Sequence, residues 1–155
     1  MPEMVLLHAT CVAMNRDGVL ILGPPGSGKS DLALRLIDQP GAGTSGRRRR
    51  AQLVADDQVL IHHHKDGLTA NAPSKLVGKL EIRGLGIVML PVRASVSLTL
   101  AVQLTEAAKI DRLPETDRAR FEVLGVALPL VLIDPAYASA PARIRAALDW
   151  HKPAD

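Results

Sequence analysis

The sequence predicts a single α/β domain built on a mixed β-sheet, with more strand than helix. One observation is an apolar run, 19–22, that stops at a glycine-rich turn and is followed by a helical stripe over 29–37. A β-branched, alternating stretch over 95–104 and an amphipathic stretch over 141–152 are the others. A chain of 155 residues is long enough to form one domain with its own core. Because the elements do not alternate strictly between strand and helix, we do not expect a wholly parallel sheet.

Apolar runs between turn signals predict the strands. Residues 4–14 are interpreted as a first strand, and the turn chemistry of 15–18 separates it from the run at 19–22. That short run is typical of a buried parallel strand. A further run, 53–61, is interrupted by two adjacent carboxylates. The stretch 118–133 suggests a short helix or turn and then another strand.

The two predicted helices each have an apolar face. The first is expected to bury Leu32, Ala33, Leu36 and Ile37. The C-terminal helix is expected to bury Ile144, Ala147, Leu148 and Trp150. Between the first helix and the next strand lies a segment rich in Pro, Gly and Ser, and we expect residues 41–50 of it to be a mobile loop insertion.

The amino-acid composition argues against single-stranded nucleic acids and membranes as binding partners. The hydrophobic fraction of 47% and the charged fraction of 23% are ordinary for a soluble protein, but only 2% of the residues are aromatic. The core is therefore expected to be aliphatic, and the chain lacks the aromatic platforms on which single-stranded nucleic acids stack. No stretch approaches the roughly 20 apolar residues of a membrane-spanning helix. We expect a cytoplasmic protein with no nucleic-acid or membrane partner.

The positive net charge of +3 is local. Four of the 19 basic residues form the run Arg47–Arg50, and without them 15 basic residues face 16 acidic ones. We expect the run to be solvated rather than part of a basic binding face. The single cysteine, Cys11, excludes an internal disulfide, fits a reducing compartment, and is expected to be buried in its apolar run.

Residues 23–30 carry the pattern G-x-x-x-x-G-K-[ST], which binds nucleotide phosphates. Glycines at this spacing let backbone N–H groups point at phosphate oxygens, and the following helix offers its N-terminal amides to the same anion. Lys29 is expected to reach the β- and γ-phosphates, and Ser30 to bind the Mg²⁺ that bridges them. The predicted nucleotide-binding residues are Gly23, Pro24, Pro25, Gly26, Ser27, Gly28, Lys29 and Ser30.

The phosphate motif does not by itself choose a reaction. The Asn-Lys-x-Asp element typical of GTP switches is absent, and 155 residues leave little room for the sensor and arginine motifs of motor ATPases. A small NTPase, a small-molecule kinase and a nucleotide-sensing regulatory module are the alternatives that remain at this point.

Two later segments supply charged side chains that can face the phosphates. On a strand, Asp56 and Asp57 would point to opposite faces, so that one faces the nucleotide while the other braces a neighbouring element. A carboxylate near the γ-phosphate can accept the proton of an attacking hydroxyl or hold metal-bound water. Glu81 and Arg83 would share one face of a strand, where they could bind a metal and stabilise phosphate charge. A surface salt bridge beside a bulge is the alternative for this second pair.

Taken in this order, the segments resemble the catalytic domain of the HPr kinase/phosphorylase family. The resemblance rests on His8, fifteen residues before Gly23, and on the strings GKSD, LVADDQV and LEIRGLGI. The last is the most specific, IDRLPETDRARFEVLGVALPLVLI is a weaker match, and together they cover about residues 5–133. The resemblance implies a P-loop fold related to phosphoenolpyruvate carboxykinase, assembled as a homo-oligomer, a hexamer in the family. The family's N-terminal domain has no counterpart in this sequence, which predicts a short form.

The resemblance also implies an activity and roles for individual residues. The family uses ATP and Mg²⁺ to phosphorylate a serine of the phosphocarrier HPr or a nitrogen-branch homologue, and it can remove that phosphate by phosphorolysis. Asp56 would be the general base toward the serine and the general acid in the reverse reaction, with Asp57 supporting it. The implied catalytic residues are His8, Lys29, Asp56, Asp57, Arg83 and Arg112, and the implied metal ligands are Ser30 and Glu81.

The run His62–His64 raises a second possible metal site. His62 and His64 would share one face of a strand, but Asp66 is the only other ligand type at suitable spacing. We therefore expect a solvated hairpin here.

Overall fold

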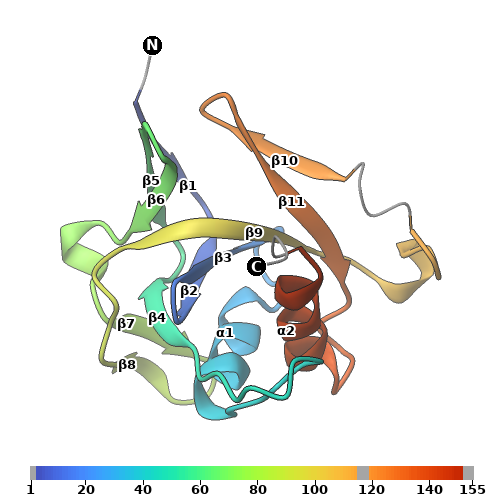
Figure 1. Ribbon diagram of the computed structural model, residues 1–155. Helices are drawn as coiled ribbons and strands as arrows, with labels where there is room; N and C mark the ends of the chain where they lie inside the picture. The colour runs from blue at the N-terminus through green and yellow to red at the C-terminus, as the bar shows by residue number, and fades with distance from the viewer. Residues whose placement is uncertain (1–2, 115–118, 152–155) are drawn as a thin grey trace.

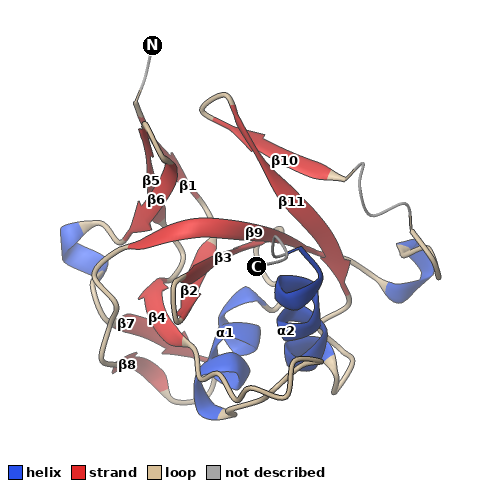
Figure 2. Ribbon diagram, viewed as in Figure 1, coloured by secondary structure: helices blue, strands red, loops and turns tan. Residues whose placement is uncertain are grey.

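The computed structural model describes residues 3–114 and 119–151 and shows a mixed sheet with two helices on one face (Figures 1 and 2). The strands are β1 (Met4–Leu7), β2 (Thr10–Met14), β3 (Asp17–Leu22), β4 (Gln52–Ala55), β5 (Val59–His64), β6 (Gly67–Asn71), β7 (Lys79–Ile82), β8 (Gly86–Met89), β9 (Val96–Leu104), β10 (Arg120–Val123) and β11 (Val126–Ile133). The helices are α1 (Lys29–Asp38) and α2 (Ala140–His151), with short 3₁₀ turns η1 (Ser74–Leu76) and η2 (Ala107–Lys109).

Nine strands form the main sheet, in the order β1-β5-β6-β9-β3-β2-β4, with β11 also paired to β9 and β10 paired to β11. β3 and β11 both run parallel to β9, whereas β2 runs antiparallel to β3 and to β4. β7 and β8 form a separate two-stranded hairpin. The predicted α/β class with a mixed sheet is therefore confirmed, and so is a parallel neighbour for the strand that precedes the phosphate loop.

The central strands are buried on both faces. Alternate residues of β2 and β3 point to opposite sides, so that Val12 and Ile21 pack with the helices while Cys11 and Leu20 pack on the other side. α1 and α2 lie side by side beneath the sheet (Figure 1), and the other face is covered by the sheet's own curled outer strands. The core is aliphatic, as the composition predicts.

Three predicted elements differ from the observed ones because the chain turns where apolar content continues. The expected strand 4–14 is two strands, separated at His8-Ala9, and the expected strand 53–61 is interrupted by a bend at Asp56-Asp57. In 118–133 the expected strand is present as β11 and a turn precedes it, but the helix alternative is wrong for the described part, which forms strand β10 of a β-hairpin. Its two-residue turn, Leu124-Gly125, has φ values of 51° and 77°, as tight hairpins require.

The arginine run is only partly solvated. Arg47, Arg48 and Arg50 are exposed, but the expectation is wrong for Arg49, which is 5% exposed. Arg49 Nη2 lies 2.7 Å from Asp149 Oδ1 on α2, and it donates to the carbonyl of Arg145. The burial arises because this loop packs against α2, about 100 residues away in sequence. The mobility of 41–50 stays a prediction.

The C-terminal helix buries Ile144 and Leu148 as predicted, and it also buries Arg145. Trp150 is 72% exposed, so its expected place on the inner face is wrong. Among the described residues, no helix is long and apolar enough to cross a membrane.

Candidate functional site

The phosphate motif forms the connection between β3 and α1. The turn needs left-handed backbone at Gly26 and Gly28, with φ of 78° and 101°, a region that residues with a Cβ avoid. α1 begins directly at Lys29, so its first amides lie beside the loop. Lys29 Nζ donates to the carbonyls of Gly23 at 2.7 Å and Pro24 at 3.1 Å, which folds the side chain back over its own loop.

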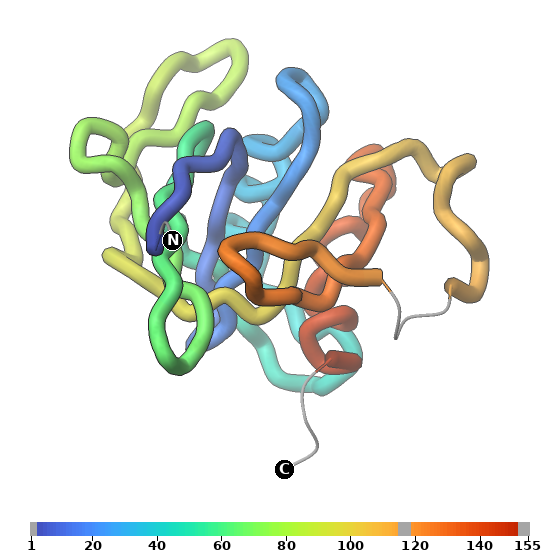
Figure 3. Tube along the Cα trace, turned by 90° about the horizontal axis from the view of Figure 1, so that it is seen from above, coloured from blue at the N-terminus to red at the C-terminus, as the bar shows by residue number. Residues whose placement is uncertain are grey.

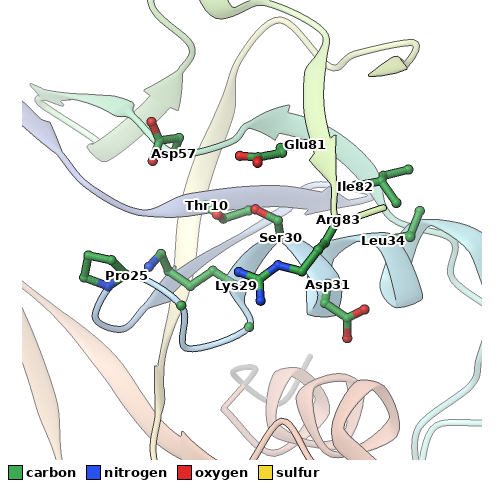
Figure 4. Close-up of a pocket in the computed structure, with 12 residues that line it drawn as sticks. Thr10, Pro25, Lys29, Ser30, Asp31, Leu34, Asp57, Glu81, Ile82 and Arg83 are labelled. Atoms are coloured by element: carbon green, nitrogen blue, oxygen red, sulfur yellow. The ribbon is translucent and has the colours of Figure 1, made fainter. Parts of the chain in front are cut away.

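A cavity of about 620 Å³ opens above this loop (Figure 4). It is bounded by the loop with the first turns of α1, by the start of β2, by the bend after β4, and by the end of β7 with the turn that follows it. Its lining residues are Thr10, Pro25, Gly26, Gly28, Lys29, Ser30, Asp31, Leu34, Asp57, Glu81, Ile82 and Arg83. Four parts of the chain that are distant in sequence thus meet at the N-terminus of α1, where the helix favours an anion.

The two adjacent carboxylates have different surroundings. Asp56 is 5% exposed and lies beneath the cavity floor, where its Oδ1 accepts hydrogen bonds from Ser30 Oγ at 2.7 Å and Thr10 Oγ1 at 2.9 Å. Asp57 has a positive φ of 69° and lines the cavity. The left-handed residue at the bend, rather than strand alternation, turns the two side chains in different directions.

Glu81 and Arg83 both line the cavity from the β7–β8 hairpin, but they do not share a strand face as expected. Glu81 lies in β7, and Arg83 lies in the turn that follows it. In Figure 4, the carboxylates of Asp57 and Glu81 lie across the cavity from the loop, and the Arg83 guanidinium reaches over the start of α1. No ion pair joins Glu81 to Arg83, both of which are described, so the salt-bridge alternative is not what the structure shows.

Besides Asp56, two predicted catalytic residues lie outside the cavity lining. His8 is exposed at the end of β1, two residues before Thr10. Arg112 is exposed beyond η2, on a segment that projects from the side of the molecule opposite the β7–β8 hairpin (Figures 1 and 3). The structure therefore brings together Lys29, Ser30, Asp57, Glu81 and Arg83, with Asp56 beneath them.

Sequence reasoning missed four residues that line the cavity. They are Thr10, Asp31, Leu34 and Ile82. Asp31 and Leu34 lie within two turns of the phosphate motif, so their proximity could have been inferred from helix geometry. Nothing in the local pattern around Thr10 indicates its hydroxyl contact, because that contact is made to a residue 46 positions later.

The cavity offers oxygen ligands of the kind that Mg²⁺ prefers. Ser30 Oγ donates its proton to Asp56, which leaves its lone pairs free, and Glu81 and Asp57 add carboxylates to the lining. Within the described residues no group of three or more His, Cys, Asp or Glu side chains could hold a metal alone. This donor set fits an ion that also takes ligands from nucleotide phosphates and water.

The histidine run forms the predicted hairpin. His62 and His64 stack at 6.2 Å and contact Asn71 and Thr69 across the β5–β6 pair, at 2.8 and 3.0 Å. Each of the two imidazole rings thus has a hydrogen-bond partner on the neighbouring strand β6.

Comparison with known proteins gives one consistent result. The family described as HPr Serine kinase C-terminal domain matches residues 1–144. The HPr kinase/phosphorylase 1 of Oceanobacillus iheyensis is 36% identical over 134 residues, covering 79% of this chain and 40% of that protein. The HPr kinase/phosphorylase of Cupriavidus metallidurans is 34% identical over 142 residues, covering 85% of this chain and 41% of that protein.

A solved structure has the same fold. The HPr(Ser) kinase/phosphatase from Coxiella burnetii superposes with a TM-score of 0.78 at 26% identity, over 95% of each chain. The chain spans about 40% of the length of the curated relatives named above.

Proposed function

The chain belongs to the HPr Serine kinase C-terminal domain family, and we propose that it is an ATP- and Mg²⁺-dependent protein kinase acting on a serine of an HPr-type phosphocarrier. The same centre is proposed to remove that phosphate by phosphorolysis. The observation that carries the proposal is the meeting of Lys29, Asp57 and Glu81 around one cavity at the N-terminus of α1. A carboxylate that faces the cavity from outside the loop can act as the base for a serine hydroxyl, and the match to a serine kinase family favours that reaction over plain hydrolysis or sensing.

Nucleotide binding is assigned to the loop and Lys29. The Lys29 ammonium has two carbonyl partners, at Gly23 and Pro24, which phosphate oxygens can replace. Such a replacement exchanges neutral acceptors for anionic ones, so the Lys29 ammonium gains an opposite charge at hydrogen-bond distance. Arg83 is in place to neutralise charge on the transferred group, because its guanidinium reaches over the start of α1 (Figure 4).

Asp57 is the general base in this proposal, in place of Asp56. A base must reach the substrate hydroxyl, and Asp57 lines the cavity whereas Asp56 lies beneath it. The serine proton passes to the Asp57 carboxylate as the serine oxygen bonds to the γ-phosphorus. The bond from that phosphorus to the β–γ bridging oxygen breaks, and ADP leaves. In phosphorolysis an oxygen of inorganic phosphate bonds to the phosphorus of phosphoserine, and the bond from that phosphorus to the serine oxygen breaks. The protonated Asp57 gives its proton to the serine oxygen, and pyrophosphate leaves.

Ser30 and Glu81 are proposed to hold Mg²⁺, which would neutralise charge on the β- and γ-phosphates. Asp56 orients Ser30 from below by accepting its proton. His8 and Arg112, implied by the family resemblance, stay predictions, as do a homo-oligomer, a cytoplasmic location and the absence of nucleic-acid or membrane partners.

Transfer of labelled γ-phosphate to purified HPr tests the proposal. The wild-type chain is expected to phosphorylate serine, and Asp57→Asn is expected to lower the rate by about 10²- to 10⁴-fold, the usual contribution of a general base. Nucleotide binding by Asp57→Asn is expected to be retained, because the loop and Lys29 are unchanged. Asp56→Asn is expected to weaken Mg²⁺-dependent nucleotide binding as well.

Three results would contradict the proposal. ATP binding without any transfer to HPr would favour a sensor, and ATP hydrolysis unaffected by HPr would favour an NTPase. Full transfer by Asp57→Asn, together with loss in Asp56→Asn, would return the base to Asp56.

A further inference from the structure

The buried carboxylate of Asp56 holds two hydroxyl groups, and only one belongs to the phosphate motif. Its Oδ1 accepts from Ser30 Oγ at 2.7 Å and from Thr10 Oγ1 at 2.9 Å. The backbone N–H of Glu81 lies 3.5 Å from the other carboxylate oxygen. Because Asp56 is 5% exposed, these groups supply the hydrogen bonds that water would otherwise give to it.

The position of Thr10 follows from strand order. β2 lies between β3 and β4, and Thr10, its first residue, pairs with Ile21 near the end of β3. The next residue, Cys11, pairs with Ala55 at the end of β4. Thr10 is therefore beside both the strand that leads into the phosphate loop and the bend that carries Asp56. Its side chain is fully buried, yet it contributes to the cavity lining.

The hydrogen-bond directions determine what Ser30 can do. A hydroxyl has one proton and two lone pairs, and Ser30 gives its proton to Asp56. Its lone pairs are then available to a cation in the cavity. This arrangement holds only while the Asp56 carboxylate keeps its orientation, which depends on its other donors. Thr10 is the only other side chain among the described residues that donates to it.

We propose that Thr10 is a positioning residue for the metal ligand Ser30, acting through Asp56. The inference rests on the proposed function, since it assumes that Ser30 binds a divalent cation together with a nucleotide. Thr10 fixes the carboxylate, the carboxylate fixes the Ser30 proton, and the Ser30 lone pairs face the cation. Groups hydrogen-bonded directly to a metal ligand commonly contribute 10- to 100-fold to metal affinity. Asp56 is in that position, and Thr10 is one hydrogen bond further out, so we expect its contribution to lie at the lower end of the range.

The chain contains a matched control. Thr99 on β9 donates its hydroxyl to Asp17 Oδ1 at 3.1 Å, also a threonine–aspartate bond between strands. Thr99 and Asp17 are not among the cavity-lining residues. Thr99→Val removes the same kind of hydrogen bond as Thr10→Val, so it reports the general consequence of losing one.

The test measures binding of Mn²⁺ with ADP by electron paramagnetic resonance of the free ion, using wild type, Thr10→Val, Thr10→Ser and Thr99→Val. Thr10→Val is expected to weaken Mn²⁺ binding about 10-fold, with Thr10→Ser and Thr99→Val within about twofold of wild type. In the transfer assay, the Mg²⁺ concentration for half-maximal rate is expected to rise in parallel, with a smaller fall in kcat at saturating Mg²⁺. If Thr10→Val does not fold by circular dichroism, Thr10→Ala takes its place.

Each other outcome overturns the inference. Wild-type Mn²⁺ affinity in Thr10→Val would show that the hydroxyl is not needed, and equal losses in Thr10→Ser and Thr10→Val would show that any change in packing at this position, rather than loss of the hydroxyl, weakens binding. An equal loss in Thr99→Val would indicate general loosening. If the wild-type chain binds no Mn²⁺ with ADP, the proposed function itself is overturned. If wild type binds Mn²⁺ and Thr10→Val binds it equally well, only the role of Thr10 is overturned.

Discussion

The two ends of helix α1 carry charged clusters that differ in what they contact. At its N-terminus, Lys29 and Ser30 border an open cavity, and within the described part of the chain Lys29 bonds only to carbonyls of its own loop. At its C-terminus, the carbonyls of Leu36 and Gln39 accept hydrogen bonds from buried Arg145, at 3.1 and 2.6 Å. One end of the helix is left open to an anion, and the other is closed by a cation from within the protein.

The closed cluster shows how buried charge is tolerated. Burial lowers the pKa of Arg145, and the neighbouring charge of Arg49 lowers it further. Backbone carbonyls of the 41–50 loop and of α2 accept hydrogen bonds from the two buried guanidinium groups, and the carboxylate of Asp149 pairs with Arg49. These contacts replace the hydration that both charges lose on burial. A cluster of charged residues therefore does not by itself identify a ligand-binding site. Charged groups that find their partners inside the protein stabilise the fold, and those that face a cavity remain available to a ligand.

The largest effect is expected at the open end, where Lys29→Ala should separate function from stability. Loss of one cationic contact to a transferring phosphate should lower the rate of transfer by on the order of 10²- to 10³-fold. The free energy of unfolding should change little, because the lost bonds are to loop carbonyls that are only partly buried at Gly23 and exposed at Pro24. Rate measurements and urea unfolding of the same preparations check both statements.

Lys109→Ala is the control for that prediction, since Lys109 is an exposed lysine in η2 outside the cavity lining. It should leave both quantities unchanged. A large fall in the stability of Lys29→Ala would contradict the distinction between the two ends of α1, because it would show that the Lys29 charge stabilises the fold as the charge of Arg145 does.

The next effect is expected at the closed end. Arg49→Met should lower the free energy of unfolding by about 3 kcal/mol, because it leaves Asp149 without its buried partner. Arg48→Met, an exposed neighbour in the same run, should stay within about 0.5 kcal/mol of wild type. Urea unfolding at neutral pH gives both values, and equal values for the two variants would refute the distinction between them.

The local sequence pattern was sufficient to predict the phosphate-binding end of α1, but it was not sufficient to predict the buried arginine cluster at the other end. The phosphate loop could be predicted because its glycines, Lys29 and Ser30 lie within eight consecutive residues whose spacing has a single physical use. The burial of Arg49 could not, because its partners Arg145 and Asp149 come from a helix about 100 residues later. A run of arginines looks the same to a local pattern whether or not a helix covers it.

The positions of the adjacent carboxylates Asp56 and Asp57 could be predicted only in part. The types of Asp56 and Asp57 and their nearness to the phosphates were predicted, and so were different surroundings for the two side chains. Which one faces the cavity depends on the bend after β4 and on the left-handed backbone of Asp57, with φ of 69°. Strand alternation predicts two faces but not which face carries the ligand.

The smallest effect concerns Cys11, which adjoins the cavity-lining residue Thr10 but is itself fully buried. Burial raises the pKa of the Cys11 thiol above the value of about 8.5 expected in an unfolded chain. Above that pH the unfolded chain loses the thiol proton while the folded chain keeps it. The free energy of unfolding should therefore fall as pH rises, by up to about 1.4 kcal/mol per pH unit.

Cys11→Ala isolates this contribution, because every other titrating group is shared with wild type. Between pH 7 and pH 9.5, about one unit above the unfolded pKa, wild type should lose about 1.4 kcal/mol more stability than Cys11→Ala in urea unfolding. If both proteins lose the same amount, the thiol ionises equally in the folded and unfolded chains. Solvent would then reach the Cys11 side chain on β2, and the interior beside Thr10 and Asp56 would be open to water.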